Sequence, residues 1–449
     1  MNEEIIVMRE LTGDRIQKWK ESYRSNGVNP EWTQKYRTSS ISDLAFKEEK
    51  AALHKFEFSV DLPTMNAISQ GHAGRCWIIA GLNMLREKAV QKMDQNLLPN
   101  GEFAFSAAYL CFWDKIEKSN CFLEKVMQTI NDPYDQPQVF SWFQYAVTDG
   151  GFWTCFSDLV RKYGLVPSEI MPETYQSSHT EELNNRLNYY IRKTGADMRN
   201  ASRHGKSIDE ICQIKDRAMN RIFTFLCRCY GCPPEVFSYT VPFSSCEIHE
   251  KRYTPTSFYQ EVLEGFVEDF INVISLPYDE LPFGEMCALD DVFKVVGMHD
   301  EIFLNLELEK LKAFCIQQLK DGMPVLCTAD DDKMCRDELQ LWDDGSFDYE
   351  EVTGFSFDMS RRDYFQLKAG SACHSMLITG VHIGDGGKVQ RWKIENSYGI
   401  NGLHKGYFTC SDSWFNQYMV SAVIHKKYLS QYQKKMTEKM NLFHIQDIL

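Results

Sequence analysis

The chain has 449 residues, of which 43% are hydrophobic and 25% charged, and its formal net charge is −14 at pH 7. These values are typical of a globular protein of two or three domains, and the negative charge argues against a surface that binds nucleic acid or anionic lipid throughout. No apolar run approaches the roughly 18 residues of a membrane-spanning helix, and the first residues do not resemble a secretion signal. The 15 cysteines are an odd number, so free thiols in a reducing compartment, by default the cytoplasm, are expected.

Helical patterns occupy the first half of the chain. Residues 1–60 are charged and are expected to form an arm that leads to the first compact unit. Apolar residues recur at helical spacing over 76–93 and 103–118, which predicts two core helices. Residues 181–226 are rich in charge and in helix formers, and they predict a helical insertion with a basic face that carries Arg186, Arg192, Lys193, Arg199, Arg203 and Lys206.

Strand patterns follow in the last third of the chain. Segments of β-branched and aromatic residues between turn residues predict strands over 323–328, 375–383, 390–395 and 420–425. Asp385-Gly386-Gly387 fits a hairpin turn between the second and the third of them. Such a hairpin would place the start of one strand beside the end of the other.

A cysteine at the start of the first predicted helix is the candidate nucleophile. Cys76 follows the glycine-containing segment from Gln70 to Arg75 and opens an apolar run. A helix N-terminus presents unpaired N–H groups and the positive end of the helix dipole, and both lower the pKa of a thiol. Cys76 is therefore predicted to form a nucleophilic thiolate near neutral pH.

A nucleophilic thiol also needs a base, a group that orients the base, and donors to the oxyanion. His374, at the entry of one predicted strand, is the candidate base, and Asn396, after the next strand, is the candidate orienting amide. Gln70 can aim its side-chain amide at the oxyanion beside the N–H of Cys76. Each residue also has a purely structural interpretation, since 15 cysteines and 11 histidines yield many Cys/His/Asn triples by chance.

Three further cysteines are spaced closely enough to suggest a metal site. Cys227, Cys229 and Cys232 lie within six positions, but a zinc site would need a fourth ligand, usually from a second cysteine pair, and none stands out. The favoured interpretation is a group of thiols between a helix and a loop. The sequence predicts neither a metal ion nor a cofactor.

The windows around the candidate residues together resemble the papain-type cysteine peptidases, which carry a Gln, a C-G-[SA]-C-[WY] element and a distant His and Asn. Here the element reads Ala73-Gly74-Arg75-Cys76-Trp77, and His374 follows Cys76 by 298 positions. This separation exceeds the usual value of roughly 130–150, so an insertion is required.

A branch with such insertions, the family of bleomycin hydrolase and the bacterial aminopeptidases, is similar to this chain from about residue 60 to residue 428. The shared motifs are Gln70-Gly71, Gly74-Arg75-Cys76-Trp77, Phe112-Trp113-Asp114-Lys115, Asp149-Gly150-Gly151, Met171-Pro172-Glu173-Thr174, Phe355-Ser356-Phe357-Asp358-Met359, His374, Glu395-Asn396-Ser397 and Gly406-Tyr407-Phe408.

The resemblance implies an α+β, papain-like fold with a helical lobe, a β-rich lobe and helical and hook-like insertions that build a homohexamer around a central channel. On this basis the chain divides into an N-terminal arm (1–60), a helical lobe with the nucleophile (61–175), an insertion for oligomerisation (176–290), a β-rich lobe (291–440) and a C-terminal tail in the cleft (441–449). No cofactor is implied.

The resemblance also implies residue roles, which agree with those reasoned from the residues themselves. It makes Cys76 the nucleophile, His374 the general base and acid, Asn396 the orienting amide and Gln70 the oxyanion donor.

Further positions are assigned by the resemblance alone. Gly150 and Gly151 match glycines that line the substrate cleft, although a simple loop turn accounts for them about as well. The C-terminal carboxylate, here on Leu449, is implied to meet the free amino group of the substrate. The apolar tail 444–449 departs from the small, alanine-ending tail expected, and Tyr398 stands where tryptophan is expected.

The function predicted from the sequence is a cysteine aminopeptidase that removes N-terminal residues from peptides through a thioester. Its expected partners are peptide substrates and further copies of the chain in a homohexamer, without a membrane.

Two alternatives remain open. A nucleic-acid-binding assembly is motivated by the basic stretch from Arg186 to Lys206, although the net charge makes this at best a side activity. A catalytically occluded scaffold would result if the tail blocks the cleft.

Overall fold

The computed structural model describes residues 9–25, 30–243, 249–289, 292–437 and 440–443. The described residues form two compact units. Unit 1 comprises those of Met1–Leu53 and Gly345–Asp358, and unit 2 comprises those of His54–Asp344 and Met359–Leu449. Within these described ranges, no helix is both long and apolar enough to cross a membrane.

Unit 1 is built from short helices. They are α1 (Gly13–Ser25), α2 (Pro30–Thr38), α3 (Ile41–Ala45), α4 (Glu48–Ala51) and α14 (Tyr349–Thr353). The Ser40 side chain caps α3 by accepting from the backbone N–H of Asp43, as short polar residues do at helix starts. The rings of Phe46 and Phe347, with centroids 5.3 Å apart and planes inclined by 56°, join the two segments of the unit.

Unit 2 contains the remaining helices and strands. Its α-helices are α5 (Cys76–Val90), α6 (Ala107–Gln128), α7 (Pro137–Tyr145), α8 (Trp153–Tyr163), α9 (Tyr175–Ser178), α10 (Glu181–Arg203), α11 (Ile208–Tyr230), α12 (Pro255–Leu263), α13 (Leu308–Lys320), α15 (Arg361–Gln366) and α16 (Asp412–Tyr418). Short 3-10 turns lie at Gln95–Leu97, Pro99–Gly101, Phe266–Asp269, Asp337–Leu339, Asp385–Gly387, Lys426–Tyr432 and Lys435–Thr437, and one at Asp344–Ser346 spans the boundary between the units.

The helix α5 lies at the centre of the helical part of unit 2. Every residue of α5 except Lys88 is buried, which fits a helix that is apolar on most of its faces. The second core helix differs from its predicted bounds, because it begins only at Ala107 and continues to Gln128. Ser106 caps it by accepting from the N–H of Tyr109, and the apolar residues before this cap pack in the core without being helical.

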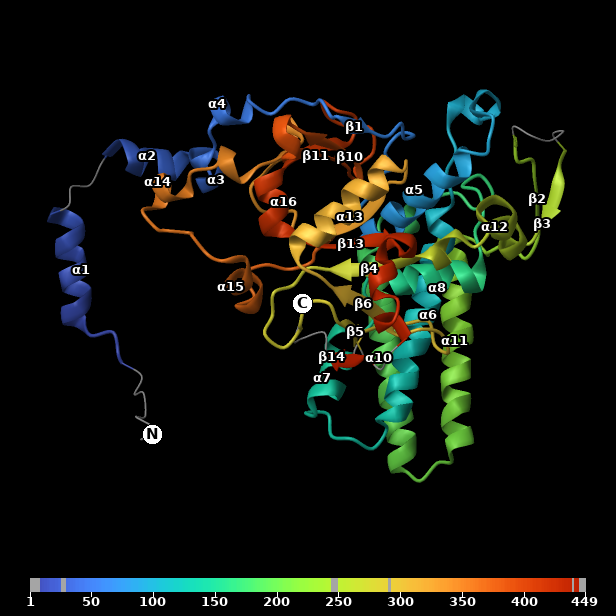
Figure 1. The fold of residues 1–449 in the computed structure, drawn as a ribbon. Helices are drawn as coiled ribbons and strands as arrows, with labels where there is room; N and C mark the ends of the chain where they lie inside the picture. Colours follow the sequence, from blue (N-terminus) through green and yellow to red (C-terminus); the bar gives the residue numbers. More distant parts are fainter. Residues whose placement is uncertain (1–8, 26–29, 244–248, 290–291, 438–439, 444–449) are drawn as a thin grey trace. The chain divides into compact units, whose positions relative to one another are not determined.

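The predicted insertion 181–226 is a helical hairpin. Helices α10 and α11 run side by side with α6 (Figure 1). The chain turns between them at Gly205, which adopts a φ of +72°, and Ser207 and Glu210 form a capping box that starts α11. The predicted helical insertion therefore consists of two helices separated by a break.

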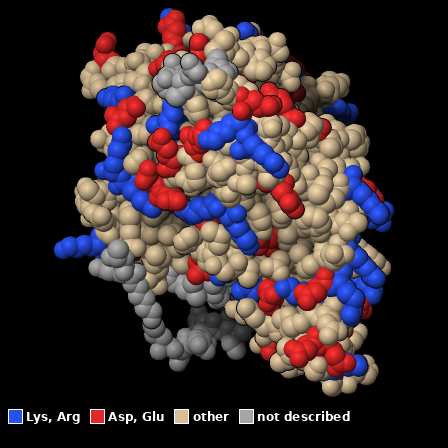
Figure 2. All heavy atoms as spheres, turned by 90° about the vertical axis from the view of Figure 1, so that its right-hand side faces the viewer, with Lys and Arg blue, Asp and Glu red and all other residues tan. Residues whose placement is uncertain are grey.

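The basic face predicted for this insertion is not a free patch of positive charge. Salt bridges join Arg186 to Glu182, Lys193 to Asp197 and Lys206 to Glu210. Among the others, Arg192 donates to backbone carbonyls, Arg199 is buried, and Arg203 lies over the ring of Tyr134. Figure 2 shows Lys and Arg interspersed with Asp and Glu over the face it presents. Acidic neighbours one helical turn away therefore neutralise three of the six basic residues, Arg186, Lys193 and Lys206.

A mixed sheet forms the rest of unit 2. Among the described residues it has twelve strands, in the order β14-β5-β6-β4-β13-β7-β10-β11-β12-β9-β8, with β1 also paired to β10. Its strands are β1 (Val60–Asp61), β4 (Phe270–Ile274), β5 (Met286–Leu289), β6 (Glu301–Asn305), β7 (Val325–Ala329), β8 (Cys335–Arg336), β9 (Leu341–Trp342), β10 (His374–Ile383), β11 (Val389–Glu395), β12 (Tyr407–Ser411), β13 (Met419–His425) and β14 (Asn441–Phe443), and a separate ribbon pairs β2 (Phe237–Tyr239) with β3 (Lys251–Tyr253).

The four predicted strands are confirmed as β7, β10, β11 and β13, with small changes at their ends. The hairpin is also present, since β10 and β11 pair antiparallel, with Leu377 opposite Glu395, around the turn at Asp385–Gly387. On its other side β10 pairs with β7, so that His374 lies opposite Ala329. The first residue of β10 therefore lies near both the end of β11 and the end of β7.

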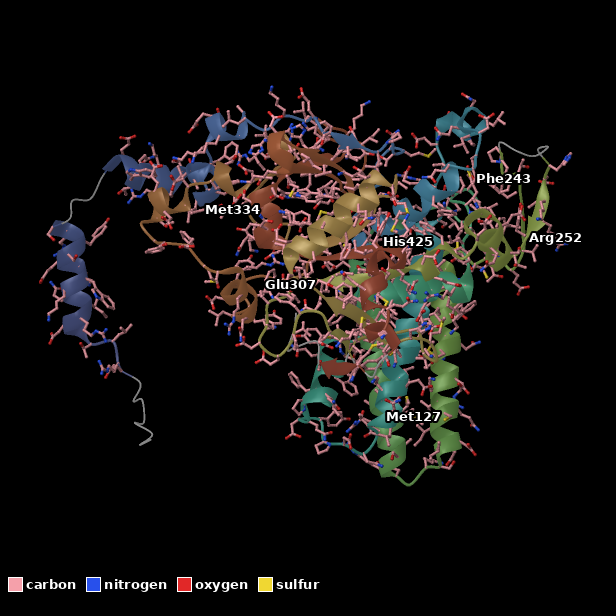
Figure 3. All side chains as sticks on the ribbon, viewed as in Figure 1. Met127, Phe243, Arg252, Glu307, Met334 and His425 are labelled. Atoms are coloured by element: carbon pink, nitrogen blue, oxygen red, sulfur yellow. The ribbon has the colours of Figure 1, made fainter. Side chains whose placement is uncertain are left out.

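Two hydrophobic clusters occupy opposite sides of the central strands. One contains side chains of α5, α6 and α8, and the other contains side chains of α13 and α16 together with Trp342, Trp392 and Trp414. Side chains fill the space between the sheet and its helices (Figure 3), where His425 marks the end of β13. This packing fixes α5 against the strands that carry the candidate site.

Buried ion pairs add a polar connection between α5 and β11. The Arg86 guanidinium lies 2.8 Å from Glu87 Oε1 and 3.2 Å from Glu395 Oε1. Asn83 also donates to Glu395 Oε1, at 2.7 Å. Because Glu395 directly precedes Asn396, this connection ties the helix that carries the candidate nucleophile to the strand that carries the candidate orienting amide.

Candidate active site

The structure places Cys76 at the first residue of α5, with only 8% of its surface exposed. The backbone N–H of Ser375 donates to its sulfur at 3.4 Å. Burial opposes ionisation of this thiol, but its hydrogen bond to His374 and the charge of that imidazole lower the pKa of Cys76 below the ordinary value. Its environment favours a thiolate paired with an imidazolium.

His374 is buried at the start of β10 and faces two of the predicted residues. Its Nε2 atom lies 2.7 Å from Asn396 Oδ1. Although burial disfavours the charged ring, the hydrogen bond to Cys76, the charges of Asp331 and Cys76 and the hydrogen bond to Asn396 raise the pKa of His374 to about 9. The imidazole is therefore protonated at neutral pH and available as a proton donor.

Asn396 is held by the loop that follows β11. Its backbone N–H donates to the carbonyl of Gly406 at 3.0 Å, and its Oδ1 also accepts from the N–H of Ser397 at 2.7 Å. The ring of Tyr398, 40% exposed, stacks on His374 with centroids 5.7 Å and planes 24° apart. An aromatic cover beside the His374–Asn396 hydrogen bond is thus present with tyrosine in place of the expected tryptophan.

Gln70 lies beside this group on the segment that leads to α5. Its side-chain amide donates to the carbonyl of Ala73 at 2.9 Å, and its Oε1 accepts from the hydroxyl of Ser397. A primary amide has two N–H donors, so one of them can serve a ligand. Gln70 lines the same cavity as Cys76 and His374.

Arg75 holds this segment in place, a role that sequence reasoning missed. Its Nε donates to the carbonyl of Gln70 at 3.0 Å, and its two terminal nitrogens bind the two oxygens of Glu173 at 3.0 and 2.9 Å. This bidentate geometry fixes the orientation of the guanidinium. The motifs around Cys76 and Glu173 were both noted in the sequence, but nothing in their spacing indicated that they contact each other.

The loop with Gly150 and Gly151 packs against Trp77, the residue that follows Cys76. The indole of Trp77 donates to the carbonyl of Asp149 at 2.7 Å, and the Lys118 ammonium donates to the carbonyl of Gly150 at 2.6 Å. Neither glycine adopts a positive φ, so a turn conformation does not require them. A Cβ at residue 151 would lie 2.5 Å from the indole of Trp77.

We expect replacement of the two glycines by alanine to have unequal effects. Gly151→Ala should lower the free energy of unfolding by about 1–3 kcal/mol, because its methyl group overlaps the buried indole of Trp77. Gly150→Ala should change it by less than about 0.5 kcal/mol, since a Cβ there meets no atom of the described chain within 4 Å. Urea unfolding of the two variants measures the difference, and equal stabilities would contradict the proposed contact.

A cavity of about 540 Å³ brings most of the predicted site residues together. Gln70, Cys76, Gly150, Gly151 and His374 all line it. The rest of its wall is largely apolar and includes Phe152, Trp153, Phe156, Phe293, Phe303 and Val420. Such a cavity suits an organic ligand with an apolar side chain. Asn396 lies behind His374, and Leu449 lies outside the described residues.

The acidic segment after β7 has the ligand types of a cation site. Asp330, Asp332 and Cys373 have potential ligand atoms within 4.8 Å of one another. However, the Lys333 ammonium already lies 3.4 Å from Asp330 and 2.9 Å from Asp332, and it supplies positive charge at this point.

Known proteins are similar to this chain over most of its length. The sequence pattern of the Peptidase C1-like family matches residues 10–447. Aminopeptidase C of Lactobacillus delbrueckii subsp. lactis is 34% identical over 84% of this chain and 83% of its own length. Aminopeptidase E of Lactobacillus helveticus is 31% identical over 96% of this chain and 97% of its own length.

A solved structure extends the likeness to the whole fold. The crystal structure of PepW from Lactobacillus rhamnosis HN001 superposes with a TM-score of 0.91, covers 98% of both chains and shares 29% sequence identity. The α+β, papain-like fold and the resemblance to the bacterial aminopeptidases, both predicted from the sequence, are confirmed. The chain therefore belongs to the Peptidase C1-like family.

Proposed function

We propose that this protein is a cysteine aminopeptidase, which removes N-terminal residues from peptides through a thioester intermediate. The observation that supports it most directly is the buried Cys76–His374 pair, oriented by Asn396 at the wall of a largely apolar cavity. The names of the similar aminopeptidases point to the same activity.

The proposed reaction starts with attack of the Cys76 thiolate on the first peptide carbonyl. The side-chain amide of Gln70 and the backbone N–H of Cys76 donate to the oxyanion that forms. The N–H of Cys76 lies in the first turn of α5, where helical N–H groups lack a partner within the helix. The His374 imidazolium then protonates the leaving amine, which leaves a thioester on Cys76. His374 next accepts a proton from water, whose attack on the thioester releases the N-terminal amino acid and restores the pair of Cys76 thiolate and His374 imidazolium.

A free amino group must be recognised for the enzyme to act as an aminopeptidase. In the proposal the C-terminal carboxylate of Leu449 meets this amine, as the resemblance implies. Residues 444–449, which include this carboxylate, lie outside the described residues, so the proposal rests on the sequence at this point.

The test compares an amino-acid fluorogenic amide with its N-acetylated twin under reducing conditions. We expect cleavage of the free-amine substrate alone. A variant that lacks residues 447–449 should cleave both substrates, because its C-terminal carboxylate would then lie three residues earlier in the chain and would no longer meet the amine. Equal cleavage of both by the wild type would indicate an endopeptidase instead, and cleavage of neither would contradict a peptidase function.

We also propose that the protein acts in the cytoplasm as a homohexamer. The resemblance to the family of bleomycin hydrolase supports the assembly, and the odd number of cysteines supports a reducing compartment. Sedimentation velocity should then give a species of about six times the 52.3 kDa chain mass.

The nucleic-acid-binding alternative loses its motivation, since the salt bridges of α10 and α11 neutralise three of its basic residues.

A further inference from the structure

A carboxylate from the segment after β7 lies next to the candidate base. Asp331 Oδ2 is 3.8 Å from His374 Nε2, the same nitrogen that faces Asn396 Oδ1 at 2.7 Å. The side chain of Asp331 is only 14% exposed. The antiparallel pairing of β7 with β10 causes this proximity, because it places Ala329, two residues before Asp331, opposite His374.

The neighbours of Asp331 fix the direction of its carboxylate. The thiol of Cys373 lies 3.4 Å from Asp331 Oδ1, closer than to its other two acceptors, the Ala329 carbonyl and Asp330 Oδ1, and Asp331 Oδ2 faces the imidazole. The acids on either side have other partners. Asp330 accepts from the Tyr364 hydroxyl and from the N–H of Ser371, and Asp332 pairs with Lys333.

The charge of Asp331 differs in kind from the contribution of Asn396. An amide orients the ring through a hydrogen bond but carries no net charge, whereas a carboxylate within about 4–6 Å of an imidazole favours its protonated form. Because the carboxylate and the imidazole are both largely buried, water screens their attraction weakly. Burial raises the pKa of the Asp331 carboxyl and the charge of His374 opposes this rise, so each group favours the ionised form of the other.

The titratable and charged groups around His374 come from several elements. Cys76 faces it from α5, Asp331 and Cys373 from the segments beside β7 and β10, and Tyr398 from the loop after β11. Asp330, Asp332 and Lys333 lie beyond Asp331 in the same acidic segment. Of the three consecutive aspartates, Asp331 is the one whose carboxylate is paired with the imidazole.

We propose that Asp331 is a positioning residue that stabilises the His374 imidazolium, and through it the thiolate of Cys76, alongside the neutral amide of Asn396. This inference rests on the proposed function of His374 in peptide hydrolysis. It adds a fourth member to the Cys76, His374 and Asn396 group, contributed by a segment with no catalytic motif of its own.

The test measures the pH dependence of kcat/KM for the free-amine substrate. The thiolate–imidazolium pair exists above the pKa of Cys76 and is lost as pH rises through the pKa of His374, which is about 9. Asp331→Asn removes the charge but keeps the shape, so we expect the alkaline limb to move down by about one pH unit, with a smaller downward shift of the acidic limb. The resulting loss of activity should be several-fold near pH 9 and small near pH 7.

A matched control is available one residue away. Asp332 is 71% exposed and pairs with Lys333, so Asp332→Asn removes the same charge without removing the carboxylate beside the imidazole. We expect the alkaline limb of this variant to stay within about 0.2 pH units of the wild type, because exposed charges are strongly screened. An Asp331→Asn profile that superposes on that of the wild type would overturn the proposal. So would a uniform loss at every pH, since it indicates a merely structural role.

A second measurement separates this inference from the proposed function. The rate of Cys76 alkylation by iodoacetamide, followed against pH by peptide mass spectrometry, reports the thiolate–imidazolium pair without any peptide turnover. If no peptide is cleaved but Asp331→Asn still shifts the alkylation profile, the proposed function fails while the role of Asp331 stands. If peptides are cleaved and the variant shifts neither profile, the role of Asp331 fails alone.

Discussion

Replacement of Cys76 by alanine is expected to lower kcat/KM for the free-amine substrate by a factor of about 10⁴ or more, since the acyl-enzyme can no longer form. The only other thiol lining the described cavity is Cys373, and it does not provide a substitute. Burial and the charges of Asp331 and Asp330 raise the pKa of Cys373 to about 12, so it carries almost no thiolate at neutral pH.

A remote cysteine provides the control for this variant. Cys232 is exposed just beyond the end of α11, so Cys232→Ala should retain full activity. Circular dichroism and thermal unfolding should show that Cys76→Ala keeps the fold of the wild type. Residual hydrolysis above about one per cent in Cys76→Ala, with contaminating peptidases removed, would assign the nucleophile elsewhere.

The largest expected loss of stability follows from Arg86→Leu. Removing this guanidinium leaves Glu87 and Glu395 buried without their cation, and breaking a buried pair on one side costs about 3–5 kcal/mol. The effect should grow with pH. Burial raises the pKa of Glu395 to about 7, and the charge of Arg86 offsets this rise only in part. The neutral carboxyl therefore stabilises the folded state, and this stabilisation is lost as pH rises through the folded-state pKa.

An exposed ion pair serves as the comparison. Lys92 pairs with Glu264, and their side chains are 31% and 74% exposed, so Lys92→Leu should cost less than about 1 kcal/mol. Urea unfolding at pH 6 and pH 8 measures both variants. Similar losses for Arg86→Leu and Lys92→Leu, or a loss for Arg86→Leu that shrinks with rising pH, would show that the buried network does not stabilise the contact between α5 and β11.

The sequence allowed the central part of the site to be predicted because each component lies in a local pattern. Cys76 opens an apolar helix, and the short turn at Asp385–Gly387 sets the hairpin that brings the ends of β10 and β11 together. A hairpin with a short turn fixes its register locally, so the proximity of His374 and Asn396 could be inferred without knowledge of the remaining fold.

The residues that escaped prediction depend on contacts between distant segments. Asp331 reaches His374 only because β7 pairs with β10, and Arg75 reaches Glu173 across nearly a hundred positions. No local pattern encodes either contact. The start of α6 was misplaced for a related reason, because buried extended residues before Ser106 continue the apolar pattern of the helix that follows.

The wall of the cavity has two parts, which differ in whether they contact Trp77, the residue after the nucleophile. The residue after the nucleophile directly determines where the glycine loop lies, so a change in that loop also disturbs the backbone that carries the thiol. Another part of the wall, with Phe293, Phe303 and Val420, comes from other segments and has no such direct link to Cys76 among the described contacts. Divergence among homologues with different substrate preferences should therefore concentrate on that part, while Trp77 and Gly151 change only together.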